Sequence, residues 1–165
     1  MKTLFALALA LSVVAAPGLA RAAEPAGLTI DVPVVLKKAD VVMNMDHLAF
    51  DGKEPFGLLY MRLMTERFAA DRTDWRIVAV FHGPAGYMIL GDKAYDRVRK
   101  TRTGNPYRAE IEKLQKAGVR FELCGQTAKE KGWGNADLLA GVQVNSGANF
   151  RIVELVQQGY VQIQP

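Results

Sequence analysis

The run from Arg76 to Phe81, RIVAVF, constrains the fold most because every residue after the arginine is apolar. A strand without alternating polar residues is typical of a parallel sheet that is covered on both faces. The segments from Ala39 to Met45 and from Val119 to Leu123 also predict strands, and segments with helical periodicity separate the three. Strands that alternate with helices in this way predict a mostly parallel sheet with helices on both faces.

Helix signals lie between the predicted strands. Apolar side chains at helical spacing predict a helix over residues 55–70, with a buried face of Phe56, Leu59, Tyr60, Leu63, Met64 and Phe68. Asn105-Pro106 is a typical start for a second helix, which Gly118 ends. The remaining pattern predicts a helix over 93–101, a loop over 124–134, a short helix over 135–139, a strand over 142–144, a helix over 148–158 and a strand over 160–163. The whole predicts one α/β domain over residues 23–165, a flavodoxin-like three-layer sandwich with a mostly parallel five-stranded sheet.

The N-terminus has the pattern of a secretory signal peptide. Lys2 gives it a positive start, residues 4–16 are an alanine- and leucine-rich apolar run, and Ala20-Arg21-Ala22 places small residues at the positions that a signal peptidase reads. We therefore expect cleavage after residue 22 and a periplasmic location. The apolar run is shorter than the roughly 20 residues of a membrane span, so no membrane insertion is expected after cleavage.

Charge and motifs argue against several classes of function. Removal of residues 1–22 takes away Lys2 and Arg21 and no acid, which leaves 19 basic against 17 acidic residues in place of 21 against 17. This small surplus gives no support to a nucleic-acid partner. The glycines of residues 51–54 and 83–86 match neither the phosphate-loop nor the dinucleotide fingerprint, so no nucleotide or flavin cofactor is expected. A single cysteine excludes a multi-cysteine zinc site.

Cys124 is the only cysteine of the chain and follows the third predicted strand. In an oxidising compartment such a cysteine is buried, reactive or paired with another chain. It acts as a nucleophile in its thiolate form, which a nearby cation or a helix N-terminus favours by lowering the thiol pKa. A buried free cysteine can equally be a small apolar residue of the core. The residues alone leave both interpretations open.

The predicted topology brings chemistry-bearing residues to one edge of the sheet. His47 follows the first predicted strand and His82 the second. In open α/β sheets the functional crevice lies outside the carboxyl ends of the strands, where the strand order reverses. In a flavodoxin-like order the first and third strands are neighbours, which would place Cys124 beside the turn at His47. We therefore expect Cys124 as the catalytic nucleophile, with His82 and His47 as modulators of its pKa. For each histidine the alternative is a hydrogen bond that shapes its own turn, and a Cys/His/His metal site has no local spacing signature here.

Three stretches carry a family resemblance: VAVFHGPAGYMIL, KLQKAGVRFELCGQTAKEKGW and GVQVNSGANFRIVELVQQGYVQIQP. They resemble the DsrE/DsrF-like family, most specifically in HGP after the second strand, in the pattern GVxFxxCGxT around the cysteine, and in the ending ELVQQGYVQIQP. The resemblance implies a small flavodoxin-like α/β domain that assembles into trimers or hexamers.

The resemblance also implies a chemistry. In cytoplasmic members the cysteine that matches Cys124 accepts sulfane sulfur as a persulfide and passes it to a partner protein. By resemblance Cys124 is the acceptor, His82 belongs to the loop that lines its pocket, and a sulfur donor or acceptor protein is the partner. The cytoplasmic members have no signal peptide, whereas this chain has one. Their cytoplasmic partners would be absent from the periplasm. The expectation is therefore a periplasmic sulfur carrier or sulfurtransferase-type protein. The alternative is a non-catalytic oligomeric module that binds a ligand or a metal and keeps Cys124 buried.

Overall fold

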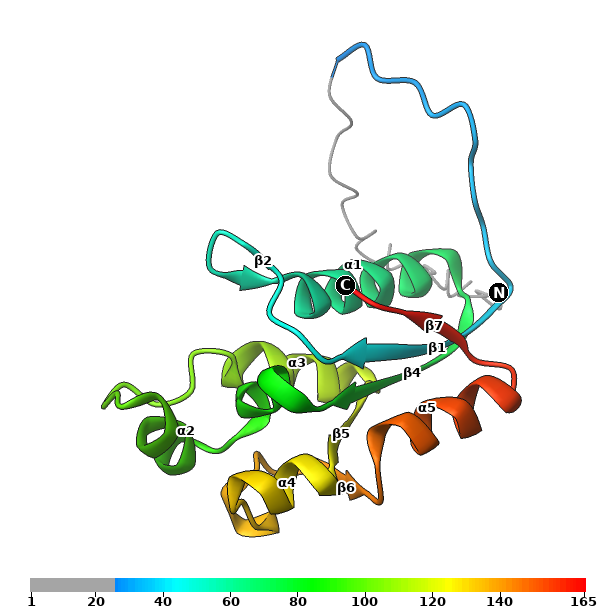
Figure 1. Ribbon diagram of the computed structural model, residues 1–165. Helices are drawn as coiled ribbons and strands as arrows, with labels where there is room; N and C mark the ends of the chain where they lie inside the picture. Colours follow the sequence, from blue (N-terminus) through cyan, green and yellow to red (C-terminus); the bar gives the residue numbers. More distant parts are fainter. Residues whose placement is uncertain (1–25) are drawn as a thin grey trace, which may run out of the picture. The chain divides into compact units, whose positions relative to one another are not determined.

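The computed structural model describes residues 26–165, so the predicted signal peptide over residues 1–22 lies outside the described residues. The chain divides into two units, Met1–Pro33 and Val34–Pro165. Residues 26–33, the described part of the first unit, contain no helix or strand. All helices and strands of the described chain belong to the second unit (Figure 1).

The second unit alternates strands and helices as its sequence predicts. It opens with β1 (Lys38–Met45), the short hairpin β2 (Phe50–Asp51) and β3 (Glu54–Pro55), helix α1 (Phe56–Asp71) and β4 (Asp74–Phe81). A 3₁₀-helix η1 (Gly83–Ile89) and helices α2 (Asp92–Arg99) and α3 (Arg108–Ala117) lead to β5 (Arg120–Cys124). The remaining elements are α4 (Gly125–Lys131), the 3₁₀-turn η2 (Asn135–Asp137), β6 (Gln143–Asn145), α5 (Ala148–Gln157) and β7 (Val161–Ile163).

The main sheet has five strands in the order β6-β5-β4-β1-β7, and every neighbouring pair is parallel. This confirms the predicted α/β fold with a five-stranded parallel sheet. The expected adjacency of the first and third predicted strands is wrong, because β4 lies between β1 and β5. Successive crossovers add β4, β5 and β6 in one direction, and the crossover through α5 alone returns to the other side of β1. The strand order therefore reverses between β1 and β7.

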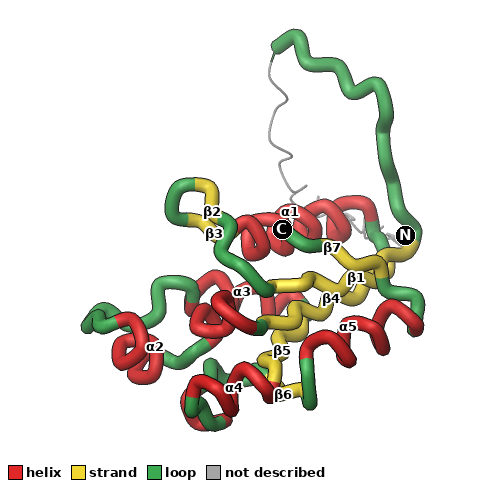
Figure 2. Tube along the Cα trace, viewed as in Figure 1, coloured by secondary structure: helices red, strands yellow, loops and turns green. Residues whose placement is uncertain are grey.

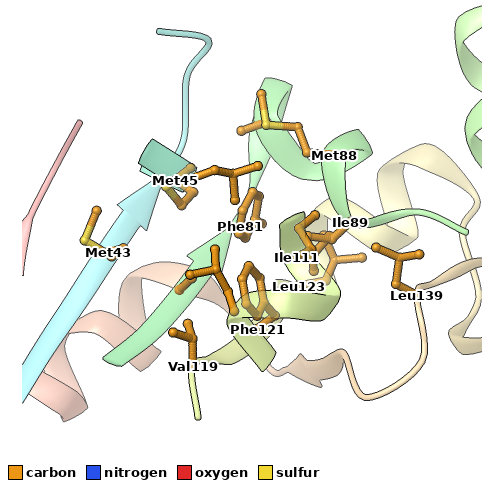
Figure 3. Packing of buried hydrophobic residues seen from close by; sticks show 14 of the residues in the cluster. Met43, Met45, Phe81, Met88, Ile89, Ile111, Val119, Phe121, Leu123 and Leu139 are labelled. Atoms are coloured by element: carbon orange, nitrogen blue, oxygen red, sulfur yellow. The ribbon is translucent and has the colours of Figure 1, made fainter. Parts of the chain in front are cut away.

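Helices cover both faces of this sheet (Figure 2). Because side chains alternate along a strand, Met43 and Phe81 pack against α1 and α3, whereas Val42 and Val80 pack against α5. The larger cluster, on the α1–α3 face, is shown in Figure 3, where the rings of Phe81 and Phe121 stack with centroids 5.9 Å apart. The two cores fix the sheet from both sides and leave the carboxyl ends of the strands free for the loops that follow them.

Helix α1 buries a different face from the predicted one. Its buried residues are Gly57, Leu58, Met61, Thr65 and Phe68. The prediction that Tyr60 and Leu63 are buried is wrong, since they are 38% and 50% exposed. Gly57 explains why the buried face differs from the predicted one, because a Cβ at this position would lie 2.2 Å from the Cε of Met45. The side of the helix that carries the glycine can approach the end of β1 closely, and this side faces the sheet.

In residues 26–165, we find no helix that combines the length and the apolar character needed to cross a membrane.

Candidate functional site

Cys124 lies where three elements meet. It is the last residue of β5, the N-cap of α4, and a neighbour of the first residue of α5, since the backbone N–H of Ala148 donates a hydrogen bond to its Sγ at 3.3 Å. The prediction of a loop over residues 124–134 is wrong, because α4 begins directly after the cysteine. Gln126 to Lys131 are compatible with a helix, and Gly132 ends it with φ 68°. The residue is 6% exposed.

The environment of Cys124 favours its thiolate. Burial raises the pKa of the Cys124 thiol. Hydrogen bonds lower it by more, so the net pKa lies below its ordinary value; the donors are the backbone N–H groups of Thr127, Ala148 and Gln126 and the hydroxyl of Thr127. These N–H groups belong to the first turns of α4 and α5, where backbone donors lack partners within the helix. A helix N-terminus also carries partial positive charge. The largest stabilising effects on the thiolate therefore come from backbone N–H groups and one hydroxyl rather than from a charged side chain.

Thr127 connects this thiol to the loop that follows β4. Its Oγ1 accepts a hydrogen bond from the backbone N–H of Gly83 at 3.0 Å, and its hydroxyl is one of the groups that lower the pKa of Cys124. Thr127 is buried and belongs to the first turn of α4. Sequence reasoning missed its role because it assigned this segment to a loop. The signal was present in the CGxT pattern, where the threonine follows the cysteine by three residues.

His82 lies at the end of β4 and is directed toward β1. Its Nε2 lies 2.7 Å from Oδ1 of Asn44, and its backbone N–H donates to the carbonyl of Met45 at 3.0 Å. Because an amide oxygen accepts, the Nε2 of His82 carries the hydrogen. Burial lowers the pKa of His82, and the nearby carboxylate of Asp46 opposes this in part. The imidazole is therefore held neutral.

A second set of polar groups surrounds the end of β1. The Nε2 of Gln164 donates to both carboxylate oxygens of Asp46 at 3.0 and 3.1 Å, and Oδ1 of Asp46 lies 2.5 Å from Nδ1 of His47. Burial raises the pKa of Asp46, but the hydrogen bond with His47 and the electrostatic influence of the two nearby imidazoles lower it by more, so the net pKa lies below its usual value. The side chain of His47 is 49% exposed. The C-terminal residues thus hold the turn that carries His47.

The structure brings His82 close to the strand of Cys124 and leaves His47 farther away. Phe81 pairs with Leu123, so His82 and Cys124 are the next residues of neighbouring strands. His47 follows β1, two strands from β5, a separation of about 10 Å from strand spacing alone. The largest effects that lower the pKa of Cys124 come from groups of α4 and α5, and the roles of the two histidines stay a prediction. Within residues 26–165, no group of three or more histidine, cysteine, aspartate or glutamate side chains is placed to hold a metal ion.

A buried ion pair lies on the same face of β5 as the cysteine. Arg151 of α5 donates to both carboxylate oxygens of Glu122 through Nε and Nη2, at 2.9 to 3.1 Å. Asn145 donates to Oε2 of Glu122 at 3.1 Å. The side chain of Glu122 is 4% exposed and that of Arg151 is 21% exposed. Sequence reasoning missed this pair, because residues 29 positions apart have no local pattern that connects them.

Comparison with known proteins supports the same fold. The structure of MTH1491, a protein of unknown function from Methanobacterium thermoautotrophicum, matches with a TM-score of 0.60 at 25% identity over 77% of this chain and 99% of that chain. The crystal structure of the ychN protein from E. coli matches in fold with a TM-score of 0.52 at 17% identity, over 77% of this chain and 99% of that chain. No curated protein matches. The model of the DsrE/DsrF-like family matches residues 37–165, and the chain belongs to this family.

Proposed function

We propose that this protein is a periplasmic sulfur carrier in which Cys124 accepts sulfane sulfur as a persulfide. The observation that carries the proposal is the set of donors around the sulfur: N–H groups of α4 and α5 and the hydroxyl of Thr127, which lower the thiol pKa despite burial. A thiolate, rather than a thiol, is the nucleophile in sulfur exchange. A cysteine that only filled space in the core would have no need of anion-stabilising donors.

The proposed step balances without a further oxidant. The thiolate of Cys124 attacks the outer sulfur of a donor persulfide, R–S–SH, and forms a new S–S bond. The old S–S bond breaks, and R–S⁻ leaves with its electron pair, which gives Cys124–S–SH. When an acceptor thiolate later attacks the outer sulfur of this persulfide, the N–H of Ala148, 3.3 Å from Sγ, stabilises the departing thiolate of Cys124. One set of donors therefore serves both loading and release.

The burial of the sulfur limits the size of the sulfur donor. Cys124 is 6% exposed, so a small donor needs less movement of α4 or α5 to reach its sulfur than a bulky donor does. We therefore propose a small hydropersulfide or polysulfide as the donor for loading. His82, which follows β4 beside Cys124 in the register, is proposed to line the approach. His47 is proposed to act at most indirectly, through Asp46.

The same burial favours a second candidate function. With the thiol enclosed, the protein would be a non-catalytic oligomeric or ligand-binding module. The two functions differ in thiol reactivity: the sulfur carrier reacts with a small alkylating reagent in its folded state faster than free cysteine at neutral pH. The thiol of a non-catalytic module reacts with the reagent only after the protein is denatured.

The decisive test of the proposal is sulfur uptake measured by intact-mass spectrometry. The protein lacking residues 1–22 is incubated with a hydropersulfide and freed of excess reagent. The expected result is a gain of one sulfur atom per chain, absent from Cys124→Ser and removed by cyanide, which takes the outer sulfur as thiocyanate. An equal gain in Cys124→Ser, or no gain in the wild type, contradicts the proposal.

Export and assembly are part of the proposal. The sequence pattern of residues 1–22 supports export, and the mature chain purified from a periplasmic fraction should begin at Ala23. A homo-oligomer, as a trimer or hexamer, is supported by apolar residues exposed on α5 and β7, among them Phe150 at 81% and Val161 at 64%. Light scattering coupled to size-exclusion chromatography tests it. A monomeric mass at micromolar concentration would contradict the homo-oligomer. A periplasmic chain that keeps residues 1–22 would contradict cleavage of the signal peptide.

A further inference from the structure

The ion pair between Glu122 and Arg151 attaches α5 to β5 beside the cysteine. Glu122 precedes Cys124 by two residues, so both side chains point to the same face of the sheet. Arg151 follows Ala148 by three residues, so both lie on the same side of α5. The two contacts, Glu122 with Arg151 and Cys124 with Ala148, are therefore consecutive points of one seam between the strand and the helix.

The two contacts are separated by similar distances on the strand and on the helix. Two residues of a strand span about 6.6 Å, and three residues of a helix span about 4.5 Å along its axis. The long side chain of Arg151 covers the difference and meets the carboxylate with two nitrogens. A bidentate guanidinium–carboxylate pair fixes orientation as well as distance. The first turn of α5 is thereby held at one position and one angle relative to the cysteine.

We propose that the Glu122–Arg151 pair is a positioning device that holds the N-terminus of α5 against the sulfur of Cys124 and so keeps the thiolate stabilised. The inference rests on the proposed function, which requires that thiolate. Neither residue touches the sulfur in the structure, so both act through the backbone N–H of Ala148. Asn145 supports the carboxylate from β6 through its own hydrogen bond at 3.1 Å.

A direct effect of charge is the competing explanation. The ionisable side chains on the elements around Cys124 come from four places. They are Arg120 and Glu122 on β5, Arg151 and Glu154 on α5, His82 after β4, and Lys129, Glu130 and Lys131 in α4. The carboxylate of Glu122 disfavours a nearby thiolate, and the guanidinium of Arg151 offsets it. Loss of one partner changes both charge and position, but loss of both at once leaves the net charge unchanged. The double variant therefore separates positioning from charge.

The test is a pH titration of the Cys124 thiolate by ultraviolet absorbance on folded protein. In Glu122→Met/Arg151→Met we expect the titration midpoint to move to higher pH, with a thiolate fraction about tenfold smaller at neutral pH, the effect of losing one charge-assisted hydrogen bond. The matched control is Asp40→Met/Arg76→Met. It removes another bidentate pair, with contacts of 2.6 Å, at the opposite end of the strands. We expect its midpoint to equal that of the wild type.

A second variant keeps the test decisive if the double variant does not fold. Arg151→Lys retains the charge but loses the two-nitrogen contact. Positioning predicts a higher midpoint for Arg151→Lys, and a midpoint equal to the wild type overturns the inference. A folded double variant with an unchanged midpoint overturns it too. If the wild-type thiol itself titrates like free cysteine and takes up no sulfur, the proposed function fails along with the inference. If the wild type loads sulfur and the variants titrate like it, the inference alone fails.

Discussion

Replacement of Thr127 by valine removes one donor from the thiolate without changing the shape of the side chain. The hydroxyl of Thr127 contributes to the lowered pKa of Cys124, and its oxygen accepts the N–H of Gly83 at 3.0 Å. A hydrogen bond to a charged group stabilises it by about 1.5 kcal/mol or more. Since about 1.4 kcal/mol corresponds to a factor of ten in the protonation equilibrium, the thiolate fraction at neutral pH should fall about tenfold.

The effect on reaction rate is smaller than the effect on the thiolate fraction. A more basic thiolate is a better nucleophile, with a Brønsted coefficient of about 0.5, so a tenfold loss of thiolate slows alkylation by about threefold. The variant also leaves the N–H of Gly83 without a partner, which should lower the free energy of unfolding by about 1–3 kcal/mol. Urea unfolding measures this loss, and the titration is made where the variant is folded.

Thr127→Ser is the matched control because it keeps the hydroxyl and loses only a methyl group. We expect its thiol to titrate close to the wild type, while the midpoint of Thr127→Val moves to higher pH. The absorbance titration of the thiolate is the primary assay, and the rate of alkylation against pH is the second. If folded Thr127→Val titrates like the wild type, the hydroxyl does not stabilise the thiolate and our account of the lowered pKa is refuted.

Three further predictions follow from the same contacts. The thiol of Cys124 has a lower pKa in the folded state than the ordinary 9.0, so the unfolded state binds this proton more tightly. As pH rises toward 9.0, the wild type should therefore gain stability relative to Cys124→Ser, as measured by urea unfolding. An equal pH dependence of the two proteins would contradict this prediction. Burial lowers the pKa of His82 from 6.5, so the wild type should lose stability as pH falls below 6.5, and thermal unfolding of His82→Gln should show a smaller loss over the same range. In Gly125→Ala the new Cβ would lie 2.7 Å from the backbone oxygen of Asn145, so we expect a loss of about 1–3 kcal/mol in urea unfolding, whereas Gly134→Ala, with open space around its Cβ, should match the wild type.

The class of the fold could be predicted because its signals are local. The apolar run from Ile77 to Phe81 has no polar alternation, and it lies in the central strand β4, covered on both faces. Strand order could not be predicted in the same way, because it depends on which edge each crossover returns to. The placement of His47 beside Cys124 failed for this reason alone.

The position of Cys124 at the end of a strand could be predicted, and the environment of its sulfur could not. Cys124 followed from its place after a buried strand and from the family pattern. Most donors to its sulfur are backbone groups of α4 and α5, which leave no trace in residue type, and the hydroxyl of Thr127 alone has a signal in the sequence. The face of α1 was misassigned for a related reason: Phe56 to Met61 is apolar on every side apart from Gly57, and the glycine that decides the rotation is silent in a hydrophobic pattern.

The central claim is that Cys124 is a stabilised thiolate that accepts sulfur, and the rate of sulfur uptake against pH tests it most directly. Intact-mass spectrometry follows the fraction of chains that gain one sulfur atom from a hydropersulfide over time. We expect uptake in the wild type with a midpoint below the ordinary thiol value of 9.0, a higher midpoint in Thr127→Val, and no uptake in Cys124→Ser. Uptake that is absent from the folded wild type and appears after denaturation alone would contradict the account.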